Sequence, residues 1–189
     1  QRLQQKLRVP LLIARNRSAR GYERALVAID FTPASAEAAH AVAYLFPNAA
    51  LHFLHLCNPL FETRLSLADA SGDVTRARRT QSLLEASRQL DNFIRSNGLQ
   101  SRRASSLVKQ GYIPACIEET ATELGVSVVA FGAKGKSRWE ANGLGSVSET
   151  FSGGAGYDVL LAKANRWPSG KRYSDRLRQG DTEGETGGM

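Results

Sequence analysis

The sequence predicts an α/β fold of three layers, in which helices cover both faces of a parallel sheet. Five short apolar runs alternate with segments whose apolar residues recur at helical spacing. The fourth run, VSVVAF, is almost wholly apolar, which is typical of a parallel strand covered on both faces. Strands and helices that alternate in this way are joined by right-handed crossovers and form a parallel sheet.

The five apolar runs are the expected strands of this sheet. In chain order they are Ala25–Phe31, Leu51–Cys57, Ala104–Gln110, Val126–Phe131 and Asp158–Lys163. In sheets of this kind ligands bind beyond the carboxyl ends of the strands, where the strand order reverses. Two of these ends carry residues that are suited to contact a ligand, because Asp30 ends the first strand and Gly132 follows the fourth.

The helices are expected between these strands. Thr32 and Pro33 are a good N-cap and first position for a helix that ends before Pro47. Further helices are predicted over about 75–97, over 113–124 with Gly125 as the stop, and, in a short form, over 146–152. Residues 58–75 have no clear period and predict a long, mobile connection.

Charge is distributed unevenly along the chain. The formal net charge is +7 and the pI is about 9.8, which raises the hypothesis of a nucleic-acid partner. Residues 1–24 carry a net +6, residues 163–189 carry +2, and the body between them carries −1. The basicity therefore belongs to the flanks, and solvated basic tails explain it better than a nucleic-acid surface.

Several other classes of protein are disfavoured. The sequence contains no run of eighteen apolar residues, so it predicts no membrane span. The N-terminal segment lacks the features of a secretory signal. The two cysteines, Cys57 and Cys116, are too few for a disulfide framework and indicate packing in a reducing compartment, the cytoplasm. His52 and His55 point to opposite faces of one strand and cannot chelate one metal, so no metal site is expected.

A glycine-rich segment follows the fourth strand and reads GAKGKSRWEANGLGS. Gly132 and Gly135 are separated by two residues, and nine more lead to Gly145 and Ser146 at a predicted helix start. Glycine lets the backbone approach an anion closely, and the free N–H groups of a helix N-terminus favour negative charge. The pattern is neither a Walker A loop nor the dinucleotide fingerprint. It predicts a phosphate site or, alternatively, only a flexible surface loop.

This segment resembles the nucleotide-binding signature of the universal stress protein family, in which all of these spacings occur. ALVAIDFTPASAEAAHAVAYL, LHFLHL and VKQGYIPACIEETATELGVSVVAFGAKGKS resemble further blocks of the same family, so that the resemblance covers about residues 24–163. It implies a five-stranded parallel sheet of order 3-2-1-4-5. One departure is FSGGAGYD before the last strand, where family members usually have a longer helix and a proline.

The resemblance also implies a ligand, ATP or another adenine nucleotide, with or without magnesium. Asp30 would contact the adenosine, the backbone of Leu56 would meet the adenine, and Gly132 would lie beside the ribose. The residues implied at the phosphates are Gly135, Gly145, Ser146 and Val147. Lys136 and Arg138 are added as phosphate partners because of their charge alone.

The N-terminal flank contains VPLLIAR, residues 9–15, which resembles the last strand of a universal stress domain. We therefore expect a leader over 1–23, a universal stress domain over 24–164 and a disordered tail over 165–189. The leader is either the final strand of a preceding tandem domain or a disordered basic segment. As a strand it would need a partner, which we expect to be the fifth strand of a neighbouring domain, the usual dimer edge of the family.

Taken together, these features predict an adenine-nucleotide-binding regulatory protein that acts in stress adaptation as a homodimer or tandem pair. Slow ATP hydrolysis is the upper limit of the enzymatic activity that we expect, because no residue is identified as a general base. Two alternatives stay open: a universal stress domain that holds no nucleotide and serves as a protein-interaction module, and a nucleic-acid-associated protein that uses its basic flanks.

Overall fold

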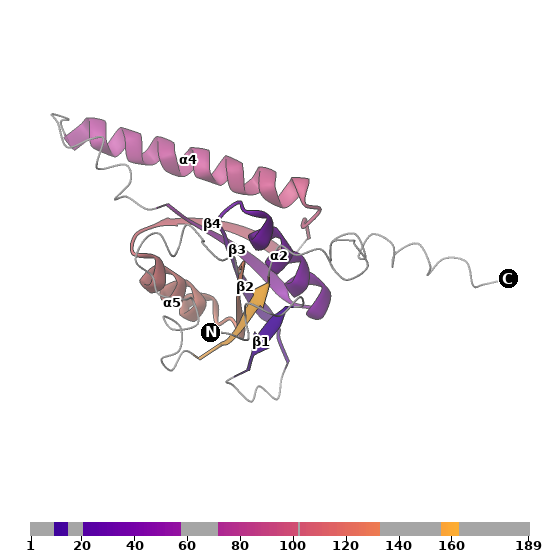
Figure 1. The fold of residues 1–189 in the computed structure, drawn as a ribbon. Coiled ribbons are helices and arrows are strands. Elements are labelled where there is room, and N and C mark those ends of the chain that lie inside the picture. Colours follow the sequence, from indigo (N-terminus) through magenta and orange to yellow (C-terminus); the bar gives the residue numbers. More distant parts are fainter. Residues whose placement is uncertain (1–9, 15–20, 58–71, 102, 133–155, 163–189) are drawn as a thin grey trace.

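The chain is built around a six-stranded sheet of order β1-β6-β5-β2-β3-β4 (Figure 1). The structure is a computed structural model and describes residues 10–14, 21–57, 72–101, 103–132 and 156–162. The strands are β1 (Leu11–Ile13), β2 (Arg24–Ile29), β3 (Ala50–Cys57), β4 (Ala104–Gln110), β5 (Val128–Gly132) and β6 (Asp158–Ala162). The helices are α2 (Pro33–Leu45), α4 (Gly72–Ser96) and α5 (Ile113–Leu124).

The predicted α/β class is confirmed, and the sheet has one strand more than predicted. Strands β2 to β6 pair in parallel. Read from β4 to β6, they lie in the order third, second, first, fourth and fifth, as the resemblance implied. The sixth strand, β1, pairs antiparallel with β6, so the sheet is mostly but not wholly parallel.

The helices form the two outer layers. Helices α2 and α4 cover one face, where Val42 and Leu90 pack in one core cluster with Phe53. Helix α5 covers the other face, where Ile117 packs in a second cluster with Leu26. Figure 1 shows α4 and α5 on opposite sides of the sheet. The alternation of side chains along each strand divides the core in this way.

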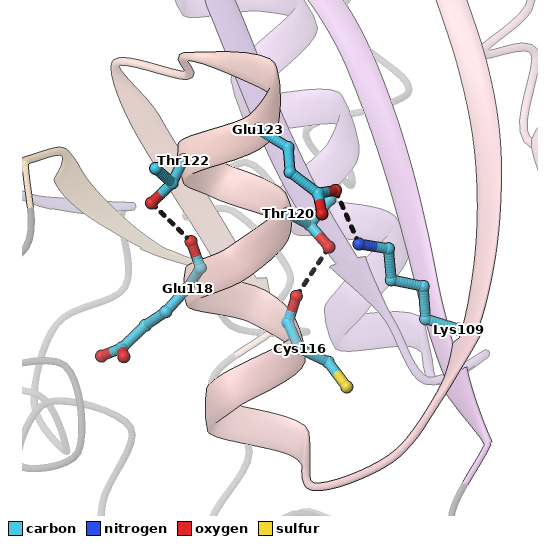
Figure 2. A network of polar contacts seen from close by, with 6 residues as sticks. All are labelled: Lys109, Cys116, Glu118, Thr120, Thr122 and Glu123. Carbon is cyan, nitrogen blue, oxygen red and sulfur yellow. Dashed lines mark hydrogen bonds and ion pairs between the residues drawn. The ribbon is translucent and has the colours of Figure 1, made fainter.

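Helix α5 is tied to the edge strand β4. Lys109 Nζ of β4 lies 2.7 Å from Glu123 Oε2 of α5 in a partly exposed ion pair (Figure 2). Along the helix the Thr120 hydroxyl donates to the Cys116 carbonyl over 2.6 Å. The helix ends where Gly125 takes the left-handed conformation with φ of 57° and its N–H bonds back to the last turn, as the glycine stop predicted.

Some element boundaries differ from the prediction, for local reasons. The first predicted strand ends at Ile29 rather than Phe31, because the chain turns at Phe31 with φ of +62°. Helix α4 begins at Gly72, three residues before the predicted start. The predicted helix over 146–152 and most of the predicted connection over 58–75 lie outside the described residues.

Strand β1 shows that residues 11–13 of the leader form a strand, and its partner is the expected fifth strand, here of the same chain. Leu12 pairs with Leu160, and pairing with the fifth strand of a neighbouring domain stays a prediction. Ten residues join β1 to β2 and have to cross three strand spacings, which is about 15 Å. Because ten residues can extend over about 30 Å, the chain is long enough to pair with its own edge.

Two further features concern the body of the fold. Asp158 at the start of β6 is fully buried, and the Tyr22 hydroxyl donates to its Oδ2 over 2.5 Å. This bond joins Tyr22, two residues before β2, to the start of β6. Within the described ranges, no helix is long and apolar enough to cross a membrane.

Candidate functional site

Three of the predicted site residues lie together at the carboxyl ends of neighbouring strands in the sheet. Asp30 directly follows β2, Leu56 is the penultimate residue of β3, and Gly132 ends β5. Strand β2 pairs in parallel with both β3 and β5, so the carboxyl ends of all three strands lie side by side. The other six predicted residues lie outside the described residues: Gly135, Lys136, Arg138, Gly145, Ser146 and Val147.

Asp30 is held in a fixed orientation by the start of helix α2. Its Oδ1 accepts the Thr32 backbone N–H over 3.1 Å and the Thr32 hydroxyl over 2.5 Å. The same hydroxyl oxygen accepts the Ser35 N–H over 3.3 Å and so caps the helix. Both hydrogen bonds from described residues fall on Oδ1, which leaves Oδ2 as an acceptor at the half-buried edge.

Phe31 supports the turn between Asp30 and Thr32. Its φ of +62° is the only positive value of a non-glycine residue among the described residues, and this conformation costs about 1 kcal/mol or more. The Phe31 ring lies 4.3 Å from the ring of His55 and 5.8 Å from that of Phe93 on α4, measured between centroids. This aromatic packing holds the backbone in its strained form.

His55 has a structural role at this turn. Its Nδ1 lies 2.8 Å from the carbonyl oxygen of Ile29, the last residue of β2. Because a carbonyl can only accept, Nδ1 carries the proton and donates. The imidazole therefore joins the ends of β2 and β3 while its face packs on Phe31.

Gly132 is required by packing against helix α2. A Cβ atom at this position would lie 2.5 Å from the carbonyl carbon of Ala34 and 2.5 Å from the backbone nitrogen of Ser35. These are backbone atoms of the first helical turn and cannot move aside easily. The glycine thus lets the N-terminus of α2 rest directly on the end of β5, beside Asp30.

Leu56 contributes a buried side chain to the α5 face of the sheet. It is 6% exposed and belongs to the same core cluster as Leu54 and Ile117. Its neighbour His55 is in register with Ile29, so the backbone of Leu56 continues past the pair that ends β2. The residue therefore brings a backbone segment, rather than a side chain, to the edge.

The side chains of His52 and Cys116 have structural roles. His52 lies 2.7 Å from the Ser105 hydroxyl, measured from Nδ1, and burial together with the charge of Arg24 lowers the pKa of its imidazole. Burial and the nearby charge of Glu119 raise the pKa of the Cys116 thiol, which disfavours the reactive thiolate. Among the described residues, no group of three or more histidine, cysteine and acidic side chains is arranged to hold a metal ion.

The sequence predicted Asp30 as a site residue but did not indicate what orients its carboxylate. The Thr32 hydroxyl was predicted as a helix cap, and it also donates to the carboxylate. The signal was the order of residues after the strand: an acidic residue, one further residue, and then threonine and proline. Nothing in that order indicated that Phe31 would adopt a positive φ.

A parallel sheet with helices on both faces, and an oriented carboxylate where the strand order reverses, defines a doubly wound α/β protein with its candidate site at the switch point. The chain belongs to the universal stress protein family, whose family model matches residues 21–163. No curated protein matches the chain.

Solved structures of similar fold agree with the mostly parallel α/β architecture. Hypothetical protein MJ0577 has a TM-score of 0.57 at 18% identity, over 75% of this chain and 96% of that one. A universal stress protein from Archaeoglobus fulgidus has a TM-score of 0.52 at 20% identity, over 82% of this chain and 50% of that one. A universal stress protein in complex with cAMP has a TM-score of 0.50 at 18% identity, over 76% of this chain and 98% of that one.

Proposed function

We propose that this chain binds an adenine nucleotide at the carboxyl ends of β2, β3 and β5. In this proposal it acts in stress adaptation as a cytoplasmic regulatory module rather than as a dedicated enzyme. The observation that carries the proposal is the Asp30 carboxylate at the switch point, whose Oδ1 accepts both hydrogen bonds from Thr32 and whose Oδ2 accepts none from the described residues. No disulfide joins Cys57 and Cys116 among the described residues, which agrees with a reducing compartment.

Asp30 is suited to the sugar of a nucleotide. A carboxylate oxygen accepts hydrogen bonds from hydroxyl groups, and charge-assisted bonds of this kind are about twice as strong as neutral ones. The two bonds from Thr32 fix the carboxyl plane before a ligand arrives, so little orientational entropy is lost on binding. In this role Asp30 positions the ligand and takes no part in a reaction.

The other predicted residues divide the ligand between them. The backbone of Leu56 would meet the adenine, and Gly132 would lie beside the ribose. The spacing of Gly132, Gly135, Gly145 and Ser146 supports a phosphate site that includes the N–H groups up to Val147. Lys136 and Arg138 would add positive charge there, with or without a bound magnesium ion.

A relative supports the ligand class. The universal stress protein in complex with cAMP has a similar fold, which shows that a sheet of this kind accommodates an adenine nucleotide in that protein. Binding would favour one conformation or assembly of the chain over another by the difference in affinity for the two states. This differential affinity is the basis of the proposed regulatory role.

Isothermal titration tests the proposal. ATP, ADP and AMP are titrated into the full chain and into a double variant, Gly145→Val with Ser146→Ala. We expect saturable binding of at least one nucleotide by the wild type and a loss of at least tenfold in affinity in the variant. Circular dichroism and thermal unfolding show whether the variant keeps its fold. An absence of binding, or equal binding by both proteins, contradicts the proposal.

One observation favours the alternative of an interaction module without nucleotide. Gly132 is fully explained by its contact with the first turn of α2, so this glycine alone does not require a ligand. The two functions are separated by extracting the purified chain and analysing the extract by mass spectrometry. An adenine nucleotide in equimolar amount supports the first function, and its absence together with silent titrations supports the second.

A further inference from the structure

We propose that Ser105, the second residue of β4, is a phosphorylation site for an arginine-directed protein kinase, and that His52 and Arg24 bind the attached phosphate. The three residues lie toward the amino ends of β4, β3 and β2. The proposed nucleotide site lies at the carboxyl ends of the strands, so this inference does not rest on nucleotide binding.

The three side chains share one face of the sheet. His52 is in register with Leu26 on one side and with Ser105 on the other. Leu26 packs in the α5-side core cluster, and Arg24 precedes it by two residues and therefore points to the same face. His52 Nδ1 lies 2.7 Å from the Ser105 hydroxyl oxygen. Ser105 and Arg24 are exposed and His52 is half-buried, so a hydroxyl, an imidazole and a guanidinium lie together at the surface.

These surroundings suit a phosphate on Ser105. Burial and the charge of Arg24 lower the pKa of the His52 imidazole, so the guanidinium acts on the ring that contacts the hydroxyl. A phosphoserine carries about two negative charges at neutral pH, which would favour the protonated ring and a charge-assisted hydrogen bond. The Arg24 guanidinium donates to the Leu124 carbonyl over 3.0 Å and has further N–H groups for a phosphate oxygen.

The residues before Ser105 suit a kinase that recognises arginines. The chain reads SRRASSLV over 101–108, so arginines stand three and two positions before Ser105. Kinases select substrates by charge patterns of this kind. The side chain of Arg103 is exposed and donates to the Asn48 carbonyl over 2.9 Å. It is therefore at the surface, where an acidic kinase pocket can bind it.

The segment is also accessible to an enzyme. Strand β4 is an outer strand of the sheet, and Ser105 lies one residue from its start. A cavity of about 280 Å³ borders this segment and is lined in part by Ser101, Ser105 and Ser106, which leaves room around these side chains. The end of an outer strand opens locally at a low free energy, so a kinase can bind the segment in an extended form.

The neighbouring Ser106 shows why the geometry favours Ser105. Ser106 is also exposed and has Arg103 three positions before it. Its side chain points to the opposite face of the sheet, where its hydroxyl donates to Asp91 Oδ1 over 2.8 Å. A phosphate on Ser106 would face this carboxylate and be repelled by it. The arginines alone do not separate the two serines, but the charges around them do.

The modification is the transfer of the γ-phosphoryl group of ATP. The Ser105 hydroxyl oxygen forms a bond to the γ-phosphorus while the bond from this phosphorus to the bridging oxygen breaks. The electron pair of the broken bond leaves with ADP, and the catalytic carboxylate of the kinase takes the hydroxyl proton. The chain supplies only the acceptor, and the kinase supplies the catalysis.

Phosphorylation of the full chain tests the acceptor. The probe is ATP with the catalytic subunit of cyclic-AMP-dependent protein kinase, which selects arginines at these positions. We expect peptide mass spectrometry to place one phosphate per chain on Ser105, at a rate about tenfold lower in Arg103→Gln. Ser105→Ala should take up none, and the matched Ser106→Ala should be modified like the wild type. No phosphate on Ser105, or equal labelling of both serines, contradicts the proposal.

Histidine NMR tests whether His52 binds the phosphate. Its imidazole resonance, identified by its absence in His52→Gln, is followed against pH in the unmodified and the phosphorylated full chain. We expect the midpoint of His52 to move to higher pH on phosphorylation, because a neighbouring negative charge favours the protonated ring. His55 is the internal control and should not move, since it lies near the carboxyl end of β3 beside Ile29. An unchanged His52 midpoint overturns the proposed phosphate-binding role.

Discussion

Two strands leave the same edge of the sheet and lead into a helix, and the two junctions are built differently. Between β2 and α2, Phe31 takes a positive φ of 62° and Thr32 caps the helix with its side chain. Between β4 and α5, Gly111 takes the positive φ of 156°, and Tyr112 stands at the N-cap with no side-chain hydrogen bond. Each helix has a proline in its first turn.

The difference shows which of the two junctions has a strained backbone. At the second junction a glycine removes the steric cost, and a Cβ atom there would lie 2.8 Å from the Cys116 sulfur. At the first junction Phe31 adopts the strained conformation, and two hydrogen bonds orient the adjacent carboxylate of Asp30. Strain that surrounding contacts maintain is typical of functional positions, so the contrast supports the proposal that the ligand binds at the β2–α2 junction.

The largest effect is expected from Gly132→Ala. The added Cβ would lie 2.5 Å from backbone atoms of Ala34 and Ser35, so α2 has to move away from β5. We expect a loss of about 3 kcal/mol in the free energy of unfolding, at the upper end of typical overpacking costs. Gly156→Ala is the control, since nothing lies within 4 Å of its added Cβ. Equal denaturation midpoints for the two variants would remove Gly132 from the account of this junction.

Gly111→Ala tests the packing of the second junction. The new Cβ would lie 2.8 Å from the Cys116 sulfur at a φ of +156°, and we expect a loss of about 2 kcal/mol. Because the contact is a side chain, adding Cys116→Ala should recover part of the loss. Urea unfolding of both single variants and the double variant gives the coupling energy. A coupling near zero would mean that the backbone conformation alone requires this glycine.

Thr32→Ala measures the capping contribution at the first junction. The variant loses the hydroxyl that caps Ser35 N–H and donates to Asp30, and we expect a loss of about 1 kcal/mol in the free energy of unfolding. Tyr112→Ala is the matched change at the second junction, where the side chain is 70% exposed and makes no cap hydrogen bond. We expect it to change stability by less than about 0.5 kcal/mol. Equal losses would contradict the contrast between the junctions.

The smallest effect is a pH dependence at the opposite end of β2. Burial and the hydrogen bond to Asp158 raise the pKa of Tyr22 from 10.0 to about 12. The fold thus favours the protonated phenol, and this contribution is fully present below pH 10 and is lost as the pH rises through 12. The stability advantage of the wild type over Tyr22→Phe should therefore shrink between these values in denaturant titrations. A constant difference across this window would contradict the assignment, and nucleotide binding at neutral pH should not change.

Much of the fold could be predicted because local patterns and packing agree. The predicted bounds of β4 and α5 match the structure, since each is set by a clear apolar period and a nearby turn residue. The early start of α4 could not be predicted, because the first turns of GDVTRARR lack an apolar period. The sequence indicated the fifth strand as the partner of β1 but not that the pair would form within one chain, because that depends on which strand edge lies within reach.

The candidate site was predictable in its residue types but not in its geometry. The sequence indicates Asp30 and Gly132 by their positions after apolar runs, and the structure brings both to the same edge. It does not indicate that Gly132 is required by contact with α2, because burial against a distant helix leaves no local pattern. The strained turn at Phe31 was hidden for a similar reason, since its support comes from His55 and Phe93.

Parallel titration of the wild type and Asp30→Asn with ATP, ADP and AMP tests the central claim, the proposed nucleotide site, most directly. The amide oxygen of asparagine can still accept both hydrogen bonds from Thr32, so the turn is retained while the charge and the second acceptor are lost. The account predicts an unchanged melting temperature and an affinity at least about tenfold lower, as for a lost hydrogen bond to a charged group. An unchanged affinity in this variant would contradict a nucleotide site at the end of β2.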